Sequence, residues 1–341
     1  MRPLYYGWPR SCRGRMLHTS GMRQLIRRMT QQLVRLGRFG ILLAVLTSAG
    51  TAGWAQSRHT AQGRTAAADW QHAIAHAGAM TPDARMLVLE IGSGQLLASA
   101  HLAEAARTLA TPGSTLKPLI LYFALEAGRW DAERRVACSR QLHIGSHRLN
   151  CSHPAAEPMD AAQALTWSCN SYFAELAGTL EPEDLHRALS ARGLLGATGL
   201  TPQESVAAFR QPRSREEVQL AALGVEGIRV SLPELAEAYR SLAIELAAHP
   251  DSKAARTVHA GLADSASFGM AGAAALGGVP VAGKTGTASA EGGGASHGWF
   301  VGLAPAESPQ VVVAVYLPSG RGSDAAQVAA SLLARSPLRK P

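Results

Sequence analysis

The chain has 341 residues, 47% of them hydrophobic, which is enough for a large core and excludes a disordered chain or a small disulfide scaffold. Its net charge of +8 originates in residues 1–60, which contain ten arginines and no acidic residue. From residue 61 onward, 23 basic residues stand against 25 acidic ones. The rest of the chain therefore has no general phosphate-binding surface, and we expect no nucleic-acid partner.

The N-terminal segment has the pattern of an export signal. A basic stretch over residues 1–36 precedes 19 uncharged residues that lie between Arg38 and Arg58. Positive charge ahead of an apolar run stays in the cytoplasm while the following chain is exported. We expect residues 37–55 to be a signal peptide cleaved after Ala55 or an uncleaved anchor, because 19 helical residues can just cross a bilayer. The protein would then be extracytoplasmic, in the periplasm or cell envelope, and bound to the membrane only if the segment is retained.

Strand and turn signals come next along the chain. Residues 56–80 are rich in Ala, Gln, His and Gly without a clear period, and we expect them to be a linker ahead of a folded domain over residues 81–341. Apolar runs at residues 86–91 and 95–100 flank a Gly-Ser-Gly turn, which predicts a hairpin. A helical pattern follows over residues 114–127.

The remaining elements predict an α+β fold. Residues 160–250 show Ala, Leu and Glu at helical spacing, punctuated by prolines. Residues 279–282, 299–303 and 311–317 are strand-like, and residues 324–334 form an amphipathic helix. Strands, then helices, then strands and a closing helix predict one antiparallel sheet packed by helices, with a helical insertion.

The cysteines suit an oxidising compartment. Cys138 and Cys151 enclose twelve residues and favour a disulfide in an exported protein, which would leave Cys169 unpaired. The same stretch contains three histidines that could join the thiols in a zinc site: His143, His147 and His153. Plain reduced thiols are the third alternative. We prefer the Cys138–Cys151 disulfide, because the spacing matches no common zinc pattern, and we expect no metal and no cofactor.

Ser114 and Lys117 place a hydroxyl and an amine on one face of a helix. A serine is a poor nucleophile until a base removes its proton, and a lysine can be that base if burial or another cation lowers its pKa. The start of a helix also favours developing negative charge. A capping serine with a surface lysine is the alternative reading of this tetrapeptide.

Two further motifs add polar groups. Ser168 and Asn170 offer a second hydroxyl for proton relay and a carboxamide for a peptide substrate, although the tripeptide also suits a helix cap. Lys284 follows a strand-like run with a positive charge, and its neighbours Thr285, Gly286 and Thr287 suit a carboxylate close to an edge strand. Alone, this could be an ordinary turn at a strand end.

Taken together, these motifs carry a family resemblance. Two of the four lysines and one of the two asparagines fall in three elements that act together in penicillin-acylated serine enzymes. The chain resembles the transpeptidase domain of penicillin-binding proteins over roughly residues 82–336. The stretches that carry the resemblance are PGSTLKP (112–118), SCNSYFAELA (168–177), IRVSLPELAEAYRSLA (228–243), VAGKTGTA (281–288) and HGWFVGLAP (297–305).

The resemblance implies a role for each motif residue. Ser114 would be the acylated nucleophile and Lys117 its neutral base, while Ser168 passes a proton to the leaving group with help from a charged Lys284. Asn170 would bind the substrate amide, and the backbone N–H groups of Ser114 and Thr287 would form the oxyanion hole. Thr285 and Thr287 would hold the donor carboxylate, and Gly286 would let the ligand backbone approach. His297, Trp299 and Phe300 are expected to be structural.

The implied activity is that of a serine D,D-transpeptidase or D,D-carboxypeptidase acting on peptidoglycan stem peptides and binding β-lactam antibiotics covalently. A β-lactamase on the same scaffold is an alternative, but we find no deacylating acid, and Asn170 departs from the class D pattern. A β-lactam sensor or cell-wall scaffold without turnover is a third reading. We expect no glycosyltransferase domain in these 341 residues, and the motifs indicate no particular oligomeric state.

Overall fold

The computed structural model describes residues 65–154, 157–289 and 294–339. The expected signal or anchor segment, residues 37–55, lies outside these residues. In the described part of the chain, no helix is both long and apolar enough to span a bilayer. The described residues belong to a single compact unit.

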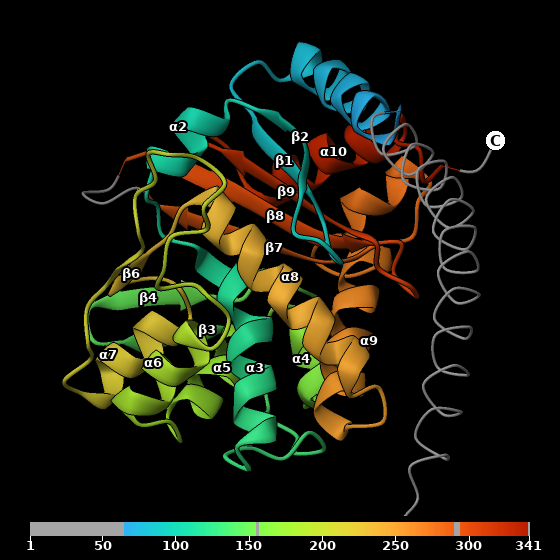
Figure 1. Cartoon of the computed structure of the whole chain (residues 1–341). Helices are drawn as coiled ribbons and strands as arrows, with labels where there is room; N and C mark the ends of the chain where they lie inside the picture. The colour runs from blue at the N-terminus through green and yellow to red at the C-terminus, as the bar shows by residue number, and fades with distance from the viewer. Residues whose placement is uncertain (1–64, 155–156, 290–293, 340–341) are drawn as a thin grey trace, which may run out of the picture. The chain divides into compact units, whose positions relative to one another are not determined.

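A five-stranded sheet lies at the centre of this unit, with the strand order β2-β1-β9-β8-β7 and antiparallel pairing throughout. An N-terminal hairpin therefore pairs with strands from the other end of the chain, and Figure 1 shows the two groups side by side. The strands are β1 (Arg85–Glu90), β2 (Leu96–Ala100), β7 (Ala282–Ser289), β8 (Ser296–Ala304) and β9 (Val311–Leu317).

Both faces of the sheet are buried. In β1, Leu87 and Leu89 pack into one apolar cluster, whereas Met86 and Val88 pack into another. Successive strand residues point to opposite faces, so a fully buried strand reads as a continuous apolar run. This accounts for the apolar run Met86-Leu87-Val88-Leu89 in β1 and for the seven buried residues of β9.

One face is covered by α10 (Gly322–Leu333) and by a helix over residues 65–80, drawn in blue in Figure 1. The expected linker over residues 56–80 is therefore wrong for its second part. Trp70 and Ile74 of this helix are buried, and four-residue spacing places them on one helical face. The helix was not predicted, because the residues between Trp70 and Ile74 are Gln, His and Ala, which add no strong hydrophobic pattern.

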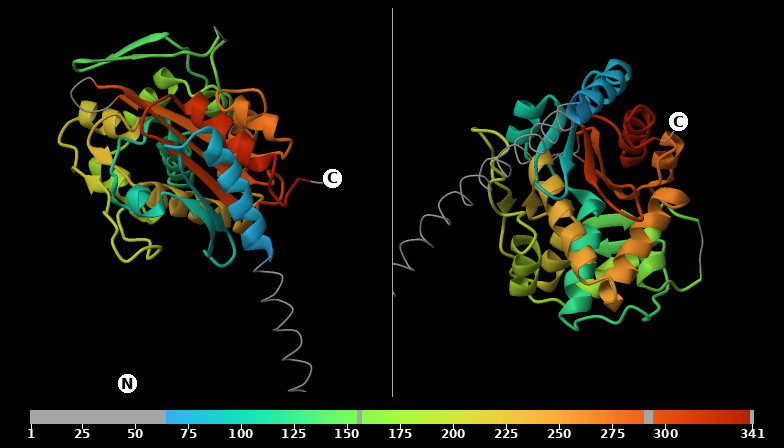
Figure 2. Two further views of the ribbon diagram at one scale, coloured as in Figure 1. Left: turned by 90° about the horizontal axis from the view of Figure 1, so that it is seen from above. Right: turned by 45° about the vertical axis from the view of Figure 1, so that its right-hand side comes forward.

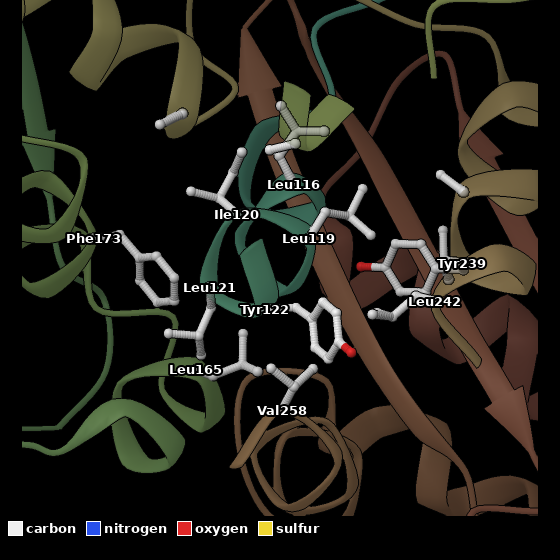
Figure 3. Close-up of a cluster of buried hydrophobic side chains, with 14 of the residues drawn as sticks. Leu116, Leu119, Ile120, Leu121, Tyr122, Leu165, Phe173, Tyr239, Leu242 and Val258 are labelled. Atoms are coloured by element: carbon white, nitrogen blue, oxygen red, sulfur yellow. The ribbon is translucent and has the colours of Figure 1, made fainter. Parts of the chain in front are cut away.

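The other face of the sheet is covered by the remaining helices. α3 (Lys117–Glu126) lies at their centre, and Figure 3 shows its Leu119, Ile120, Leu121 and Tyr122 pointing outward to different neighbours. Seven of its ten residues are buried, so the helix is apolar on nearly all sides. The surrounding helices are α2 (Leu102–Arg107), α4 (Ala161–Thr166), α5 (Asn170–Ala177), α6 (Pro182–Ser190), α7 (Arg215–Ala222), α8 (Leu232–Ala248) and α9 (Lys253–Ser267).

Two small hairpins complete the unit. β3 (Gln141–Ile144) pairs with β4 (His147–Asn150), and the short β5 (Ala208–Phe209) pairs with β6 (Ile228–Arg229). Figure 2 shows the β3–β4 hairpin at the periphery of the molecule. Neither hairpin was predicted, because their strands are short and half exposed and lack a strong alternating pattern.

The predicted hairpin of strands near residue 90 is confirmed, as are the strand over residues 311–317 and the final helix. The strand expected over residues 279–282 is wrong, because β7 begins only at Ala282 and continues through the Lys-Thr-Gly-Thr motif. The predicted helix from Ser114 is divided into a 3-10 helix, η1 (Gly113–Leu116), and α3. Pro118 favours this new start, since proline is tolerated in the first turn of an α-helix.

Candidate active site

Ser114 lies on η1, and Lys117 is the first residue of α3. Ser114 is half-buried, whereas the side chain of Lys117 is 0% exposed. Tyr239 of α8 donates a hydrogen bond of 2.8 Å from its hydroxyl to the carbonyl oxygen of Thr115, which fixes η1 to the helical layer. The surface-lysine alternative is therefore excluded, since burying an ammonium group is expensive and rarely occurs without a role.

β7 packs directly against η1, and the contact depends on glycine. A Cβ atom at Gly286 would lie 2.4 Å from the carbonyl oxygen of Pro112, inside any normal contact distance. Gly113 has a φ of +55°, and a Cβ there would meet the Thr287 carbonyl oxygen at 2.9 Å. We expected Gly286 to make room for a ligand. It instead makes room for the segment that carries Ser114.

Ser168 occupies the junction between α4 and α5. Its φ of 55° places a non-glycine residue in the left-handed region, a conformation that persists only where the surrounding structure imposes it. Asp160 and Gln163 close a capping box at the start of α4, and Asn170 begins α5. Ser168 itself lies between the C-terminus of α4 and the first residue of α5, and its backbone N–H donates to the Leu165 carbonyl oxygen at 3.2 Å.

The three motifs meet at the hydroxyl of Ser168. Lys284 Nζ donates to Ser168 Oγ at 2.9 Å, and Lys117 Nζ lies 3.4 Å from the same oxygen. Lys117 also donates to the Ser168 carbonyl oxygen at 2.8 Å and to Asn170 Oδ1 at 2.7 Å. Asn170 is held in turn by a 3.1 Å bond from its Nδ2 to the carbonyl oxygen of Asn150 at the end of β4. A hydroxyl between two amines can relay a proton from one to the other.

Burial is the largest cause of the pKa shifts of Lys117 and Lys284. It lowers the pKa of Lys117 to about 8, and the nearby thiols of Cys169, Cys151 and Cys138 oppose that shift. Burial, with the charge of Lys117 as a second cause, lowers the pKa of Lys284 well below its ordinary value. Within the described residues neither ammonium group contacts a carboxylate, so no counter-charge offsets the loss of solvation.

The expected charge states differ from this arrangement. We expected Lys284 to keep its proton, whereas burial and repulsion from Lys117 hold the pKa of Lys284 well below its ordinary value. Lys117 has three acceptors within reach, Ser168 O, Asn170 Oδ1 and Ser168 Oγ, which together suit an ammonium group in the resting state. A proton must then leave Lys117 before it can act as a base.

Thr287 is exposed beside a cleft of about 1010 Å³ that it helps to line together with β4 and the β5–β6 hairpin. Its Oγ1 accepts a 2.9 Å hydrogen bond from the backbone N–H of Gly322, so its own proton remains available for a ligand. Gly322 is the first residue of α10, whose N-terminus favours negative charge. Thr285 is buried, and its hydroxyl donates to the Met270 carbonyl oxygen at 3.3 Å, which makes it the less available of the two.

His297, Trp299 and Phe300 are structural, as expected. His297 Nε2 and Trp299 Nε1 lie 2.8 and 2.9 Å from the carbonyl oxygen of Thr111, just before η1. Trp299 and Phe300 are buried on opposite faces of the sheet. The positioning residues Tyr239 and Asn150 were missed at the sequence level, because their effect depends on contacts with η1 and Asn170 that no local pattern records.

The expected disulfide is absent. Cys138, Cys151 and Cys169 are free thiols. Cys151 Sγ lies 4.0 Å from Cys169 Sγ, about twice the length of a disulfide bond. Cys138 Sγ lies 3.4 Å from the imidazole of His153. All three thiols therefore belong to one cluster, and no exclusive Cys138–Cys151 pair exists.

Solved structures with the same fold come from several bacteria. The transpeptidase domain of Burkholderia pseudomallei penicillin-binding protein 3 superposes with a TM-score of 0.69 at 21% identity, covering 81% of this chain and 96% of that one. A structure described as a peptidoglycan glycosyltransferase from Burkholderia ambifaria gives a TM-score of 0.67 at 22% identity, covering 80% and 94%. At such identities the likeness concerns the fold alone.

Sequence comparisons identify the family. The probable peptidoglycan D,D-transpeptidase PenA of Neisseria meningitidis is 27% identical over 240 residues, which cover 62% of this chain and 40% of the relative. PenA of Neisseria gonorrhoeae matches over the same shares. The chain thus spans less than half the length of these curated relatives. A family model for the penicillin-binding protein transpeptidase domain matches residues 86–335. This chain therefore belongs to the penicillin-binding protein transpeptidase domain family.

Proposed function

We propose that the chain is a serine D,D-transpeptidase or D,D-carboxypeptidase that acts on peptidoglycan stem peptides through an acyl-enzyme and is acylated by penicillin. The observation that carries this proposal is the position of Ser168 Oγ, within 2.9 Å of Lys284 Nζ and 3.4 Å of Lys117 Nζ. Two buried amines that share one hydroxyl can take a proton from a nucleophile and return it to a leaving group.

Acylation begins when Lys117, after losing a proton, accepts the hydroxyl proton of Ser114. Ser114 Oγ then forms a bond to the carbonyl carbon of the penultimate D-alanine, and negative charge develops on the carbonyl oxygen. The backbone N–H groups of Ser114 and Thr287 stabilise this oxyanion, which is supported by the direct packing of η1 on β7. The bond to the nitrogen of the terminal D-alanine breaks, and that nitrogen receives the proton through Ser168.

Deacylation reverses these roles. An incoming amine of a second stem peptide, or a water molecule, attacks the ester carbon while its proton passes through the Ser168 hydroxyl to Lys117, which then returns a proton to Ser114 Oγ. The bond to Ser114 Oγ breaks, and Ser114 recovers its proton. An amine acceptor makes the enzyme a transpeptidase, and water makes it a carboxypeptidase.

The donor carboxylate is assigned to the hydroxyl of Thr287, with Thr285 beside it. Support comes from the unused proton of Thr287 and from the adjacent N-terminus of α10. Asn170 is assigned to the substrate amide; its Oδ1 is shared with Lys117, so substrate binding and base position are linked.

An extracytoplasmic site fits this substrate. Members of the family are in general extracytoplasmic, and the arginine-rich start of the chain, followed by an uncharged segment, supports export. Membrane attachment through residues 37–55 belongs to the same proposal if that segment is retained.

Mass spectrometry of the purified protein tests the activity. With a D-Ala-D-Ala donor peptide and a labelled amine, we expect release of D-alanine and a mass increase on Ser114. Ser114→Ala should abolish both, whereas Ser93→Ala, at an exposed turn serine, should leave them unchanged. Turnover that survives in Ser114→Ala would contradict the assignment of the nucleophile.

The lifetime of a fluorescent penicillin adduct separates this function from the β-lactamase alternative. We expect label on Ser114 that persists for minutes through a chase with unlabelled drug, far slower than the ~10 s⁻¹ median of enzymes. Loss of the label within seconds, with excess hydrolysed drug, would favour the β-lactamase.

A further inference from the structure

A cluster of three thiols and one imidazole lies next to the candidate active site. It consists of Cys138 ahead of β3, Cys151 and His153 after β4, and Cys169 between Ser168 and Asn170. The ligand-type atoms of these four residues all lie within 4.8 Å of one another. Among the described residues, this is the one group of its kind.

The spacing suits a tetrahedral metal ion. Zinc bonds of ~2.3 Å to sulfur and ~2.0 Å to nitrogen place neighbouring ligand atoms about 3.5 to 3.8 Å apart at the corners of a tetrahedron. The distance from Cys138 Sγ to His153 Nε2 is 3.4 Å, and Cys151 Sγ lies 4.0 Å from Cys169 Sγ. Small shifts of a few tenths of an ångström would bring these pairs to the ideal separations.

The imidazole is already turned for ligation. His153 Nδ1 lies 2.6 Å from the carbonyl oxygen of Pro154, which can only accept, so Nδ1 carries the proton. The unprotonated Nε2 then faces Cys138 Sγ. Metal-binding histidines characteristically donate their other ring N–H to a carbonyl or carboxylate in this way.

Backbone N–H groups around the sulfurs also favour metal binding. Asn170 N donates to Cys151 Sγ at 3.2 Å, and Arg140 N donates to Cys138 Sγ at 3.4 Å. Such N–H donors stabilise thiolates, which accept more strongly than neutral thiols. The Arg140 guanidinium also donates to the His153 carbonyl oxygen and brings positive charge beside the cluster.

We propose that Cys138, Cys151, His153 and Cys169 bind one zinc ion. The three thiols lose their protons to solvent when the ion binds, so the charged complex comprises one dication, three thiolates and a neutral imidazole. Four protein ligands leave no open position, which makes the site structural. A disulfide would use only two of the four ligand atoms that the structure brings together.

The ion would tie the β3–β4 hairpin to the Ser168 motif. Cys169 is the residue between Ser168, with its left-handed backbone, and Asn170, whose side chain also bonds to the Asn150 carbonyl at the end of β4. Because Cys169 follows Ser168 directly, an ion that joins it to the three ligands of the hairpin region would keep Ser168 Oγ close to the amines of Lys117 and Lys284. The site is thus a positioning device, and its metal content does not depend on the proposed transpeptidase activity.

Metal analysis of the full-length protein tests the proposal. We expect one zinc per chain after purification without chelators, and a cobalt-substituted protein with the intense visible bands of tetrahedral cobalt bound to thiolates. His153→Ala should lower zinc affinity by more than the roughly 10–100-fold that loss of an outer partner causes. The matched control His143→Ala removes an exposed histidine of the same hairpin and should keep full occupancy.

Thiol chemistry gives an independent readout that needs no variant. With zinc bound, alkylation should be slow at Cys138, Cys151 and Cys169, and a chelator should make all three reactive together. A metal-free protein with three reactive thiols would overturn the proposal, as would a disulfide between any two of them in protein isolated from its own cell envelope. Equal zinc content in His153→Ala and wild type would also overturn it.

Discussion

Lys284 Nζ lies 2.9 Å from Ser168 Oγ, although the two residues are 116 positions apart in the chain. The contact joins β7, at the edge of the central sheet, to the junction of α4 and α5 in the helical layer around α3. Because Lys117 of α3 reaches the same oxygen, side chains from three separate segments meet at this hydroxyl.

Lys117→Arg tests the base. Arginine keeps the positive charge, but its guanidinium does not lose a proton in proteins, so acylation by penicillin should fall roughly 10²- to 10⁴-fold, the usual contribution of a general base. The rate is measured by stopped-flow with a fluorescent penicillin. Lys253→Arg, at an exposed lysine paired with Asp131 and Glu133, is the control and should acylate normally. Near-normal acylation in Lys117→Arg would place the base elsewhere.

The pH dependence of acylation follows from the buried lysine. Since only the neutral form of Lys117 can accept a proton, and burial lowers its pKa to about 8, the basic fraction rises from about a tenth at pH 7 to about nine tenths at pH 9. The acylation rate should therefore increase about tenfold between these pH values. Far-UV circular dichroism over the same range controls for unfolding. A rate that does not change with pH would contradict the assignment.

Gly286→Ala tests the contact between β7 and η1. The new Cβ atom would lie 2.4 Å from the Pro112 carbonyl oxygen, so the segment carrying Ser114 must move. Overpacking of this kind lowers the free energy of unfolding by about 1–3 kcal/mol, and a displacement of about 1 Å can slow the reaction roughly 100-fold. Gly92→Ala is the matched control, because nothing lies within 4 Å of a Cβ there. Unchanged acylation in Gly286→Ala would show that the contact is dispensable.

Trp70→Ala tests whether the helix over residues 65–80 belongs to the folded unit. The Trp70 side chain is only 2% exposed, and truncating such a residue reduces the free energy of unfolding by about 3–5 kcal/mol. Urea denaturation measures the change. His72→Ala, on the exposed face of the same helix, should stay within about 0.5 kcal/mol of wild type. Equal stability of both variants would mean that these residues are indeed a linker.

The strongest local signals were sufficient for part of the fold. The strand over residues 311–317 and the hairpin near residue 90 follow from continuous apolar runs, since a strand buried on both faces has no polar positions. Segments with a weak hydrophobic pattern were not predicted. The half-exposed β3–β4 hairpin and the alanine-rich helix over residues 65–80 have no strong period, and only their packing partners stabilise them.

The sequence by itself determined which chemical groups are available. Ser114, Lys117, Ser168, Asn170 and Lys284 stand in three short motifs, and the family resemblance that these motifs carry identified them together. Only the tertiary structure decided how they act. It buries both lysines and so lowers their pKa values. It packs Gly286 so closely against Pro112 that no side chain fits there, and it brings Cys169 to a histidine and two cysteines of another segment. Solvation and contact distance depend on residues far away in the chain, and a local sequence pattern carries no information about them.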